Sequence, residues 1–378
     1  MDIVIKSQKI KLLDSPELLT DAIKWLEDKS VVAVDTESDS LFVYYEKVCL
    51  LQLTDGSRNF IADPLVLGNL DHLNPLFESK SILKIFHAAE YDIMCLKRDY
   101  GFTFNNVFDT MIAARILGRK EIGLGSLIEQ EFGIHLEKKF QKSNWGLRPL
   151  PEDMLLYATL DTSFLIDLRD HLEKELIDRD LMALAQEDFN RVCKSPPAAA
   201  EPVSIQWWRI AGNNRDLTFQ QAAALQNLCV LREQIAKKMD LPLFKVIQND
   251  VLVELALQKP VTETDLSEIK GLTKFIIKKY GKSILTAIES SKNARSLPRP
   301  ANIPKPSMDV LNRKDLLKNW RKEMGLKYDV PSDVILPKDI LEKIASENPK
   351  GKEDLKLIMN DIPWRYQHFS EQILSVIR

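Results

Sequence analysis

The first half of the chain alternates short apolar runs with stretches of helical periodicity. The runs that are rich in β-branched residues, and therefore predict strands, are 31–35, 48–54, 59–62 and 82–86. The turn residues Thr54-Asp55-Gly56 between the second and third runs indicate a hairpin. Helical periodicity is found at 88–99, 109–117, 124–132 and, most strongly, 151–179. This order of elements predicts an α/β domain whose mixed sheet is flanked by helices.

Two proline-rich stretches, 195–202 and 296–306, interrupt the pattern. Because proline clusters cannot continue a helix, we interpret both stretches as linkers. A chain of 378 residues also exceeds what one hydrophobic core usually supports. We therefore expect three domains, at 1–195, 205–295 and 307–378.

The second and third of these parts are predicted to be all-helical, and they repeat each other. A shift of 89 residues, without gaps, pairs Arg232 with Arg321 and Pro242 with Pro331. Most of the matched positions are apolar, so the repeat predicts two copies of one helical bundle. Such copies could be packing and spacing elements or two copies of a binding module.

Charge is distributed unevenly between the halves. Residues 1–200 carry 23 basic and 33 acidic side chains, whereas residues 201–378 carry 29 basic and 22 acidic ones. The net charge of −3 hides this asymmetry, so it excludes a uniformly basic coat protein but not a nucleic-acid enzyme. Lysines gather in both repeats, at 270, 274, 278, 279 and 282, and at 314, 318, 322 and 327 with Arg321. These clusters are either solvated faces or contacts for RNA phosphates.

The sequence contains no apolar run long enough to span a bilayer, so we expect no membrane association. The four cysteines are scattered and form no C-x-x-C pair, which argues against a zinc site or a disulfide framework. Reduced thiols of this kind are typical of a cytoplasmic protein.

Acidic residues stand at positions where elements of the α/β domain end or begin. Asp35 and Glu37 close the first strand and, being two residues apart, share one face of it. Asp92 follows the fourth strand, about one turn into a helix. Tyr157 and Asp161 are four residues apart in a helix and project from the same side.

Each of these positions alone is common on protein surfaces, but together they suit divalent metal ions. Carboxylate oxygens select Mg²⁺ or Mn²⁺ over Zn²⁺, and no cluster of Cys or His competes for a metal. Two such ions could hold both the attacking and the leaving oxygen of a phosphodiester.

These motifs resemble a known family. Val34-Asp35-Thr36-Glu37, His87-Ala-Ala-Glu-Tyr-Asp92 and Tyr157-Ala-Thr-Leu-Asp161 are similar, in order and spacing, to the three motifs of the DEDDy exonucleases. The stretch 140–150 resembles the segment before the third motif in the ribonuclease D family, and both repeats resemble HRDC domains. The resemblance covers nearly the whole chain.

The resemblance implies an RNase H-like exonuclease domain followed by two HRDC-like helical bundles. It also implies a 3′→5′ exoribonuclease that releases 5′-nucleotides, with tRNA precursors or other structured RNA as substrate. By family analogy two ions, Mg²⁺ or Mn²⁺, would be held by four carboxylates: Asp35, Glu37 and Asp161 would hold the ion that activates water, and Asp35 and Asp92 the other. Tyr157 would orient the attacking water.

Some residues near the motifs have a less defined role. Asn144 stands where the family usually has Asp, which puts in doubt any contact that residue would make. His87 is expected to be structural, because carboxylates already supply the metal ligands. Phe42, Tyr44 and Tyr45 follow the first motif and could stack on terminal bases, although Phe42 could equally pack in the core. Trp207 and Trp208 are expected to pack between domains.

Two other functions share these features. A Werner-type 3′→5′ DNA exonuclease has the same motifs, and a non-catalytic RNA-binding subunit could retain the fold. The complete set of carboxylates argues against the second alternative. We expect a monomer whose basic helical modules grip RNA while its 3′ end enters the acidic site.

Overall fold

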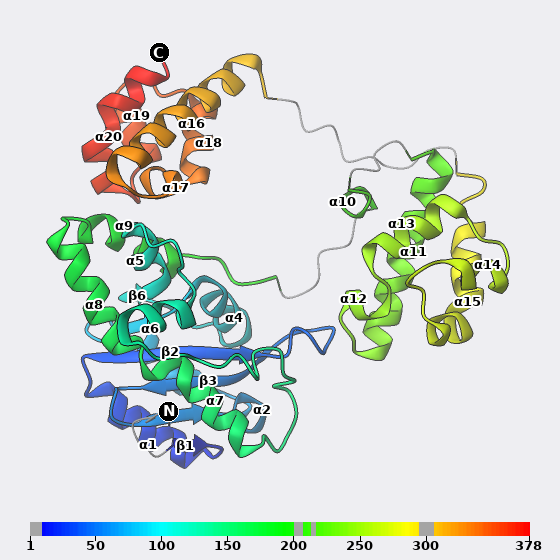
Figure 1. Cartoon of the computed structure of the whole chain (residues 1–378), viewed down its shortest axis with the longest axis horizontal. Coiled ribbons are helices and arrows are strands. Elements are labelled where there is room, and N and C mark those ends of the chain that lie inside the picture. Colours follow the sequence, from blue (N-terminus) through cyan, green and yellow to red (C-terminus); the bar gives the residue numbers. More distant parts are fainter. Residues whose placement is uncertain (1–9, 200–206, 213–216, 295–305) are drawn as a thin grey trace. The chain divides into compact units, whose positions relative to one another are not determined.

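The structure, a computed structural model, describes residues 10–199, 207–212, 217–294 and 306–378 (Figure 1). Its chain divides into two compact units. The first unit comprises residues 1–38, 48–198 and 306–378, so it joins the α/β domain to the second helical repeat. The second unit comprises residues 39–47 and 199–305, and contains the first repeat. Parts of both predicted linkers, 200–202 and 296–305, lie outside the described residues.

A mixed sheet of six strands forms the centre of the α/β domain, in the order β1-β4-β3-β2-β5-β6. The strands are β1 (Ile10–Leu13), β2 (Val31–Ser38), β3 (Val48–Thr54), β4 (Asn59–Ala62), β5 (Leu83–Phe86) and β6 (Val107–Asp109). β3 is antiparallel to β2 and to β4, whereas the other neighbouring pairs are parallel. The mixed sheet and the β3–β4 hairpin are as predicted. β1 and β6 were not predicted: β6 has only three residues, and β1 has a single β-branched residue, Ile10.

Helices cover both faces of this sheet. They are α1 (Pro16–Glu27), α2 (Pro64–Leu67), the 3₁₀ helix η1 (Asp71–Leu73), α3 (Asn74–Glu78), α4 (Glu90–Tyr100), α5 (Thr110–Ile116), α6 (Leu124–Phe132), α7 (Glu152–Ser163), α8 (Leu165–Asp178) and α9 (Met182–Cys193). One buried apolar cluster packs α1, α3 and α4 against the sheet. A second packs α5, α8 and α9, and a smaller one packs α7.

The long helix predicted over 151–179 is two helices, α7 and α8, which meet at Phe164. Near this junction the hydroxyls of Thr162 and Ser163 both donate to the carbonyl of Thr159. Such side-chain bonds compete with the helical ladder and bend or end it. Asp161 therefore lies in the last turn of α7, and Pro151 precedes the helix as its N-cap residue instead of occupying N1.

The two helical repeats match residue by residue. In the first, the helices are α11 (Phe219–Met239), α12 (Leu243–Val246), α13 (Asn249–Gln258), α14 (Glu263–Glu268) and α15 (Lys274–Glu289), preceded by α10 (Trp207–Ile210). In the second they are α16 (Met308–Tyr328), α17 (Ser332–Ile335), α18 (Lys338–Glu347), α19 (Lys352–Ile358) and α20 (Pro363–Val376). From α11 and α16 onward, every helix begins 89 residues after its counterpart, as the sequence repeat predicted.

A paired arginine shows how closely the copies agree. The guanidinium of Arg232 donates to the carbonyl of Ile247 over 2.9 Å, and that of Arg321 donates to the carbonyl of Leu336 over 3.0 Å. Each carbonyl belongs to the residue that ends the short second helix of its module. The two arginines that the sequence repeat pairs therefore make the same helix-end hydrogen bond in both modules.

The second unit also contains the loop Asp39–Lys47 that joins β2 to β3. Tyr44 is buried in the core of the first helical module, where its hydroxyl donates to Glu233 over 2.9 Å. Its backbone N–H donates to Asp240. Tyr44, for which the sequence suggested stacking on bases, therefore packs in a core instead. Trp207 also packs in this core, within the module and not between domains.

Candidate active site

β2 and α7 bring three of the predicted carboxylates together. Asp35 and Glu37 lie on β2, and Asp161 reaches them from the last turn of α7. Each residue offers one oxygen such that all three oxygens lie within 4.8 Å of one another. The predicted pairing of two strand residues with one helix residue is therefore present as a compact group of oxygen donors.

Asp92 lies beside this group but is not a member of it. The hydroxyl of Thr36, on the strand between Asp35 and Glu37, donates to the Asp92 carboxylate. The charge of Asp92 still contributes to the raised pKa of Asp35 and of Glu37. The fourth predicted carboxylate thus stands near the other three, held by a threonine whose role the motif alone does not reveal.

The carboxylates disfavour ionisation because they are buried close to one another. Burial first, and then the charges of its three acidic neighbours, raises the pKa of Asp35 well above its usual value. Burial, followed by the charges of Asp161 and Asp92, raises the pKa of Glu37 to about 9. Burial raises the pKa of Asp92 to about 7 and that of Asp161 to about 6.

None of the ion pairs found in the described part of the chain involves these four carboxylates. A buried acidic cluster without a basic partner is costly unless a cation compensates it. The donor set consists only of oxygens, which is the set that hard divalent cations prefer. The residues present therefore fit divalent metal, which exonucleases of this fold generally use.

A pocket of about 310 Å³ opens at this group. Tyr157 lines it together with Asp35, Glu37 and Asp161. Burial, followed by the nearby negative charges, raises the pKa of the Tyr157 phenol, so the hydroxyl keeps its proton at neutral pH. Tyr157 is therefore a hydrogen-bond donor or acceptor beside the carboxylates.

His87 also lines the pocket, although its ring is bonded to a structural partner. Its Nδ1 lies 2.9 Å from the hydroxyl of Thr110, and burial lowers its pKa to about 4. The imidazole is thus neutral under ordinary conditions. Polar residues outside the three motifs also line the pocket, among them Lys138 and Gln141. These two belong to an irregular segment, where no periodic pattern could have drawn attention to them.

Asp109 organises the backbone ahead of Asp92. Its carboxylate accepts hydrogen bonds from the N–H groups of Ala88 and Ala89, over 3.1 and 2.8 Å. Ala88 has a φ of 62°, a left-handed conformation that residues with a side chain rarely adopt. The buried Asp109 side chain compensates this strain and fixes the point at which α4 begins. It is a positioning residue for Asp92 that no motif spacing revealed.

The segment before α7 is fixed by Arg148. Its guanidinium pairs with Asp63 over 2.6 and 2.7 Å and donates to the carbonyl of Cys49 over 2.8 Å. Trp145 is buried in the same region. Asn144, which departs from the family pattern, accepts a hydrogen bond from the N–H of Gly146 and so stabilises the turn itself.

Known families match most of the chain. Residues 10–177 match the 3'-5' exonuclease family, and residues 221–288 and 311–377 match the HRDC domain. These domains indicate that the chain binds nucleic acid. No helix within the described ranges is long and apolar enough to cross a membrane.

Curated relatives share this arrangement over nearly their whole length. Ribonuclease D of Bartonella henselae is 27% identical over 386 residues, which covers 98% of this chain and 91% of the relative. Ribonuclease D of Zymomonas mobilis is 29% identical and covers 92% of this chain and 88% of the relative.

A solved structure has the same fold. Escherichia coli RNase D, described as an exoribonuclease involved in structured RNA processing, superposes with a TM-score of 0.70 at 21% identity. The match covers 98% of this chain and 99% of that one. The exonuclease domain, the tandem HRDC domains and these relatives lead to one conclusion: the chain is a ribonuclease D-like protein with a 3′-5′ exonuclease domain.

Proposed function

We propose that this protein is a metal-dependent 3′→5′ exoribonuclease that removes 5′-nucleotides one at a time from the 3′ end of RNA. The family and the exonuclease domain support the activity. The observation that carries the metal dependence is the group of three carboxylate oxygens within 4.8 Å of one another, to which no described basic side chain is paired.

The ligands we assign are four carboxylates. Asp35, Glu37 and Asp161 would hold one divalent ion, and Asp35 with Asp92 would hold a second. Mg²⁺ or Mn²⁺ fits this set best, because both ions prefer hard oxygen ligands. When bound, the ions lower the pKa of a water molecule and neutralise the charge that develops on the phosphate oxygens.

The remaining residues of the site position the reactants. The protonated hydroxyl of Tyr157 orients the attacking water or a phosphate oxygen by hydrogen bonding. Lys138, an exposed residue of the pocket lining, offers a positive charge for the phosphate of the RNA strand. Neutral His87 does not exchange a proton here, because burial holds its pKa near 4.

The substrate class we propose is structured RNA with an accessible 3′ end, including tRNA precursors. The protein acts as a monomer of three domains, at 1–195, 205–295 and 307–378, in the cytoplasm. Four free cysteines are consistent with a reducing compartment.

The test uses an RNA hairpin with a single-stranded 3′ tail, labelled at its 5′ end so that shortened products are resolved, and a DNA of the same sequence. Each is incubated with the full chain in Mg²⁺, in Mn²⁺ or in EDTA. We expect a ladder of products that shorten from the 3′ end, with the metals only and faster on RNA. Preference for DNA would favour the Werner-type alternative, and no shortening of either strand would favour a non-catalytic RNA-binding protein.

A further inference from the structure

The last helix of each module has the same backbone but a different surface. α15 carries four lysines and a single glutamate, Glu289, at its end. α20 carries one arginine, Arg365, and one glutamate, Glu371. Since the helices correspond residue by residue, the two surfaces can be compared position by position.

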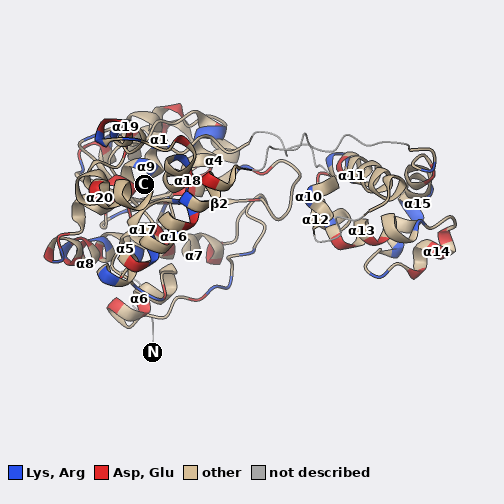
Figure 2. Cartoon of the chain, turned by 90° about the horizontal axis from the view of Figure 1, so that it is seen from above, with Lys and Arg blue, Asp and Glu red and all other residues tan. Residues whose placement is uncertain are grey.

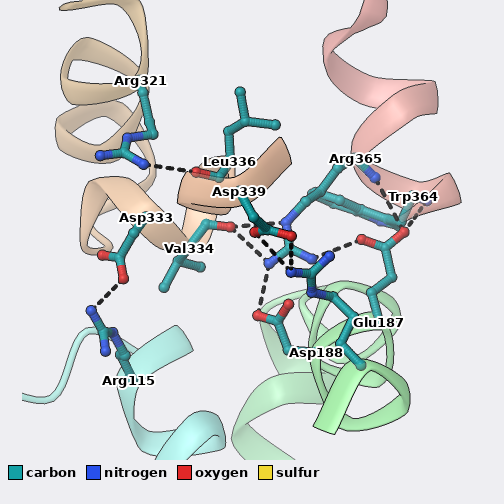
Figure 3. Close-up of polar contacts among 11 residues, drawn as sticks. Arg115, Glu187, Asp188, Arg321, Asp333, Val334, Leu336, Asp339, Trp364 and Arg365 are labelled. Carbon is teal, nitrogen blue, oxygen red and sulfur yellow. Dashed lines mark hydrogen bonds and ion pairs between the residues drawn. The ribbon is translucent and has the colours of Figure 1, made fainter. Parts of the chain in front are cut away.

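In the second copy this helix start is covered by the catalytic domain (Figure 3). The backbone N–H of Trp364 donates to Glu187, and Arg365 pairs with Glu187 and Asp188 over 2.9 and 2.8 Å. Arg365 is completely buried, and its guanidinium also bonds to the carbonyl of Val334. Trp364 packs against the apolar cluster of the catalytic domain.

More ion pairs surround this contact. Asp333 pairs with Arg115, Asp339 pairs with Arg191 over 2.9 Å, and Lys194 pairs with Asp361 over 2.5 Å. The second module is therefore a fixed part of the catalytic unit.

The first copy lacks most of the residues that make this contact, although Asp250 stands at the position of Asp339. The positions of Asp333, Asp361 and Arg365 are occupied by Phe244, Leu272 and Ile276, none of which can form an ion pair. Phe275, at the position of Trp364, is 55% exposed.

The lysines of α15 are also available. All four, at 274, 278, 279 and 282, are exposed, and among the described residues no ion pair involves them. Figure 2 shows basic residues on α15. Lys274, Lys278 and Lys282 are spaced by four residues and so form a stripe about 12 Å long. One strand of a duplex places a phosphate about every 3.4 Å along its axis, so the stripe can meet several phosphates.

Aromatic rings lie within the same surface. The ammonium of Lys279 lies 5.3 Å from the centre of the Phe275 ring and 5.4 Å from that of Tyr280. Tyr280 is partly buried in the module core, whereas Phe275 is exposed. An exposed ring among lysines without ion pairs is the combination that binds unpaired bases together with their phosphates.

We propose that an RNA strand binds the surface formed by Lys274, Phe275, Lys278, Lys279 and Lys282 of the first module. In the second module the corresponding positions hold Pro363, Trp364, Gln367, His368 and Glu371, so that surface carries no Lys or Arg. Trp364 contacts the catalytic domain, and the other four are exposed. RNA is the occupant that the charge favours, because three lysines in line complement phosphates and not an apolar partner. The identity of the ligand rests on the proposed exoribonuclease function.

The lysines of the second module are placed differently. Lys314 pairs with Glu342, Lys318 pairs with Asp315, and Arg321 is used on the carbonyl of Leu336. α16 also interleaves its bases with Asp309, Asp315 and Glu323, so it presents no uninterrupted basic stripe. We therefore propose RNA binding for the first module only, and not for both modules.

The test measures binding of the full chain to a 3′-fluorescein RNA hairpin with a single-stranded tail, in EDTA to prevent hydrolysis, between about 50 and about 300 mM salt. We expect the triple variant Lys274→Ala, Lys278→Ala, Lys282→Ala to bind about tenfold more weakly or worse. Its plot of log affinity against log salt should lose about two units of slope. Phe275→Ala should weaken binding about fivefold or more and leave the slope unchanged.

The matched control removes three exposed lysines from the second module, with Lys318→Ala, Lys322→Ala and Lys327→Ala. We expect this variant to keep nearly the wild-type affinity and slope. If the α15 variant kept the salt slope of RNA binding, or if the control lost as much RNA affinity, the proposal would be overturned. Either result would favour a protein partner at this surface.

Hydrolysis of a tetranucleotide separates this inference from the proposed function. A tetranucleotide is too short to need the module, so the α15 variant should degrade it at the wild-type rate. If the wild type bound RNA through α15 but degraded neither substrate, the exoribonuclease proposal would fail and the binding surface would stand. Normal degradation by an α15 variant with unchanged RNA affinity would overturn the binding surface and leave the exoribonuclease proposal standing.

Discussion

Two groups of buried carboxylates in the first unit are treated in opposite ways. At the interface with the second module, Glu187 and Asp188 meet the buried guanidinium of Arg365. At the end of β2, Asp35 and Glu37 meet only further acids, Asp92 and Asp161. The first group is neutralised by the chain itself, whereas the second has no basic partner among the described residues and fits a divalent cation. The comparison separates a structural use of buried acids from a functional one.

The difference has a clear energetic meaning. A buried ion pair contributes little net stability, but removing one partner leaves an unpaired charge and is strongly destabilising. In the acidic group at the end of β2, removing one acid should increase stability, because it relieves repulsion between like charges. Substitutions in the two groups should therefore affect stability with opposite signs.

The largest effect is expected for Asp161→Asn. It should lower the rate of RNA hydrolysis on the order of a thousandfold, because a proposed ligand of the activating ion loses its charge. The melting temperature without metal should stay the same or rise. Product ladders and thermal unfolding in EDTA measure the two quantities.

Asp178→Asn is the control for Asp161→Asn, since it removes an equal charge from the exposed end of α8. It should leave both the rate and the melting temperature nearly unchanged. A near-normal rate for Asp161→Asn would show that the site is assigned wrongly.

Arg365→Ala should have the largest effect on stability. It leaves Glu187 buried and unpaired, which should lower the free energy of unfolding by about 3–5 kcal/mol. Urea denaturation measures this change. The double variant with Glu187→Gln should recover part of the loss, because the uncompensated charge is then gone.

Lys356→Ala, on an exposed position of the second module, is the matched control and should unfold like the wild type. If Arg365→Ala cost no more than this control, the interface would not anchor the module as described.

A smaller effect is expected for Asp109→Asn. The backbone N–H groups of Ala88 and Ala89 now donate to the Asp109 carboxylate. The N–H₂ group of an asparagine side chain cannot accept such a bond, so the conformation of Ala88 and the position of Asp92 should be disturbed. We expect activity to fall about tenfold to a hundredfold, with a higher Mn²⁺ concentration needed for half-maximal rate.

Asp55→Asn tests whether that effect is specific. Asp55 also holds backbone N–H groups, those of Ser57 and Arg58, but in the β3–β4 turn. It should leave the Mn²⁺ requirement unchanged. If both variants needed the same Mn²⁺ concentration for half-maximal rate, Asp109 would have only a general structural role.

The smallest effect concerns pH. Raised pKa values mean that the folded state binds protons more tightly than the unfolded state, whose carboxyls titrate near 3.8 to 4.5. The associated stability is complete below those values and is lost as pH rises through about 6 for Asp161, 7 for Asp92 and 9 for Glu37.

Without metal, the melting temperature should therefore fall by several degrees between about pH 5.5 and about pH 9. Mg²⁺ or Mn²⁺ should reverse the fall, because the ionised carboxylates are then paired. Asp161→Asn should show a shallower pH dependence, and an equally steep one would argue against the carboxylates as its cause.

Much of the fold was readable from the sequence because it is encoded locally. The strands β2 to β5 and the helices α4 to α6 follow from apolar periods within single segments. The two modules follow from an 89-residue repeat that preserves even the paired Arg232 and Arg321. What failed were short strands and the break at Phe164, where side-chain bonds to the backbone outweigh periodicity.

The sequence by itself determined which residues form the candidate site, because the order and spacing of three motifs are properties of the chain. Only the tertiary structure decided that Thr36 holds Asp92, that Asp109 sets the start of α4 and that Tyr44 is buried in the first module.

The tertiary structure also decided that only the second of two modules with the same helices packs on the catalytic domain through Arg365. The sequence repeat does show that Arg365 stands where the other copy has the apolar Ile276. This comparison indicates a buried charge, but it does not indicate which residue pairs with it. Glu187 lies 178 residues away, and only folding brings the two together. Local preferences specify elements and motifs, whereas the compensation of buried charge depends on distant groups that meet after the chain has packed.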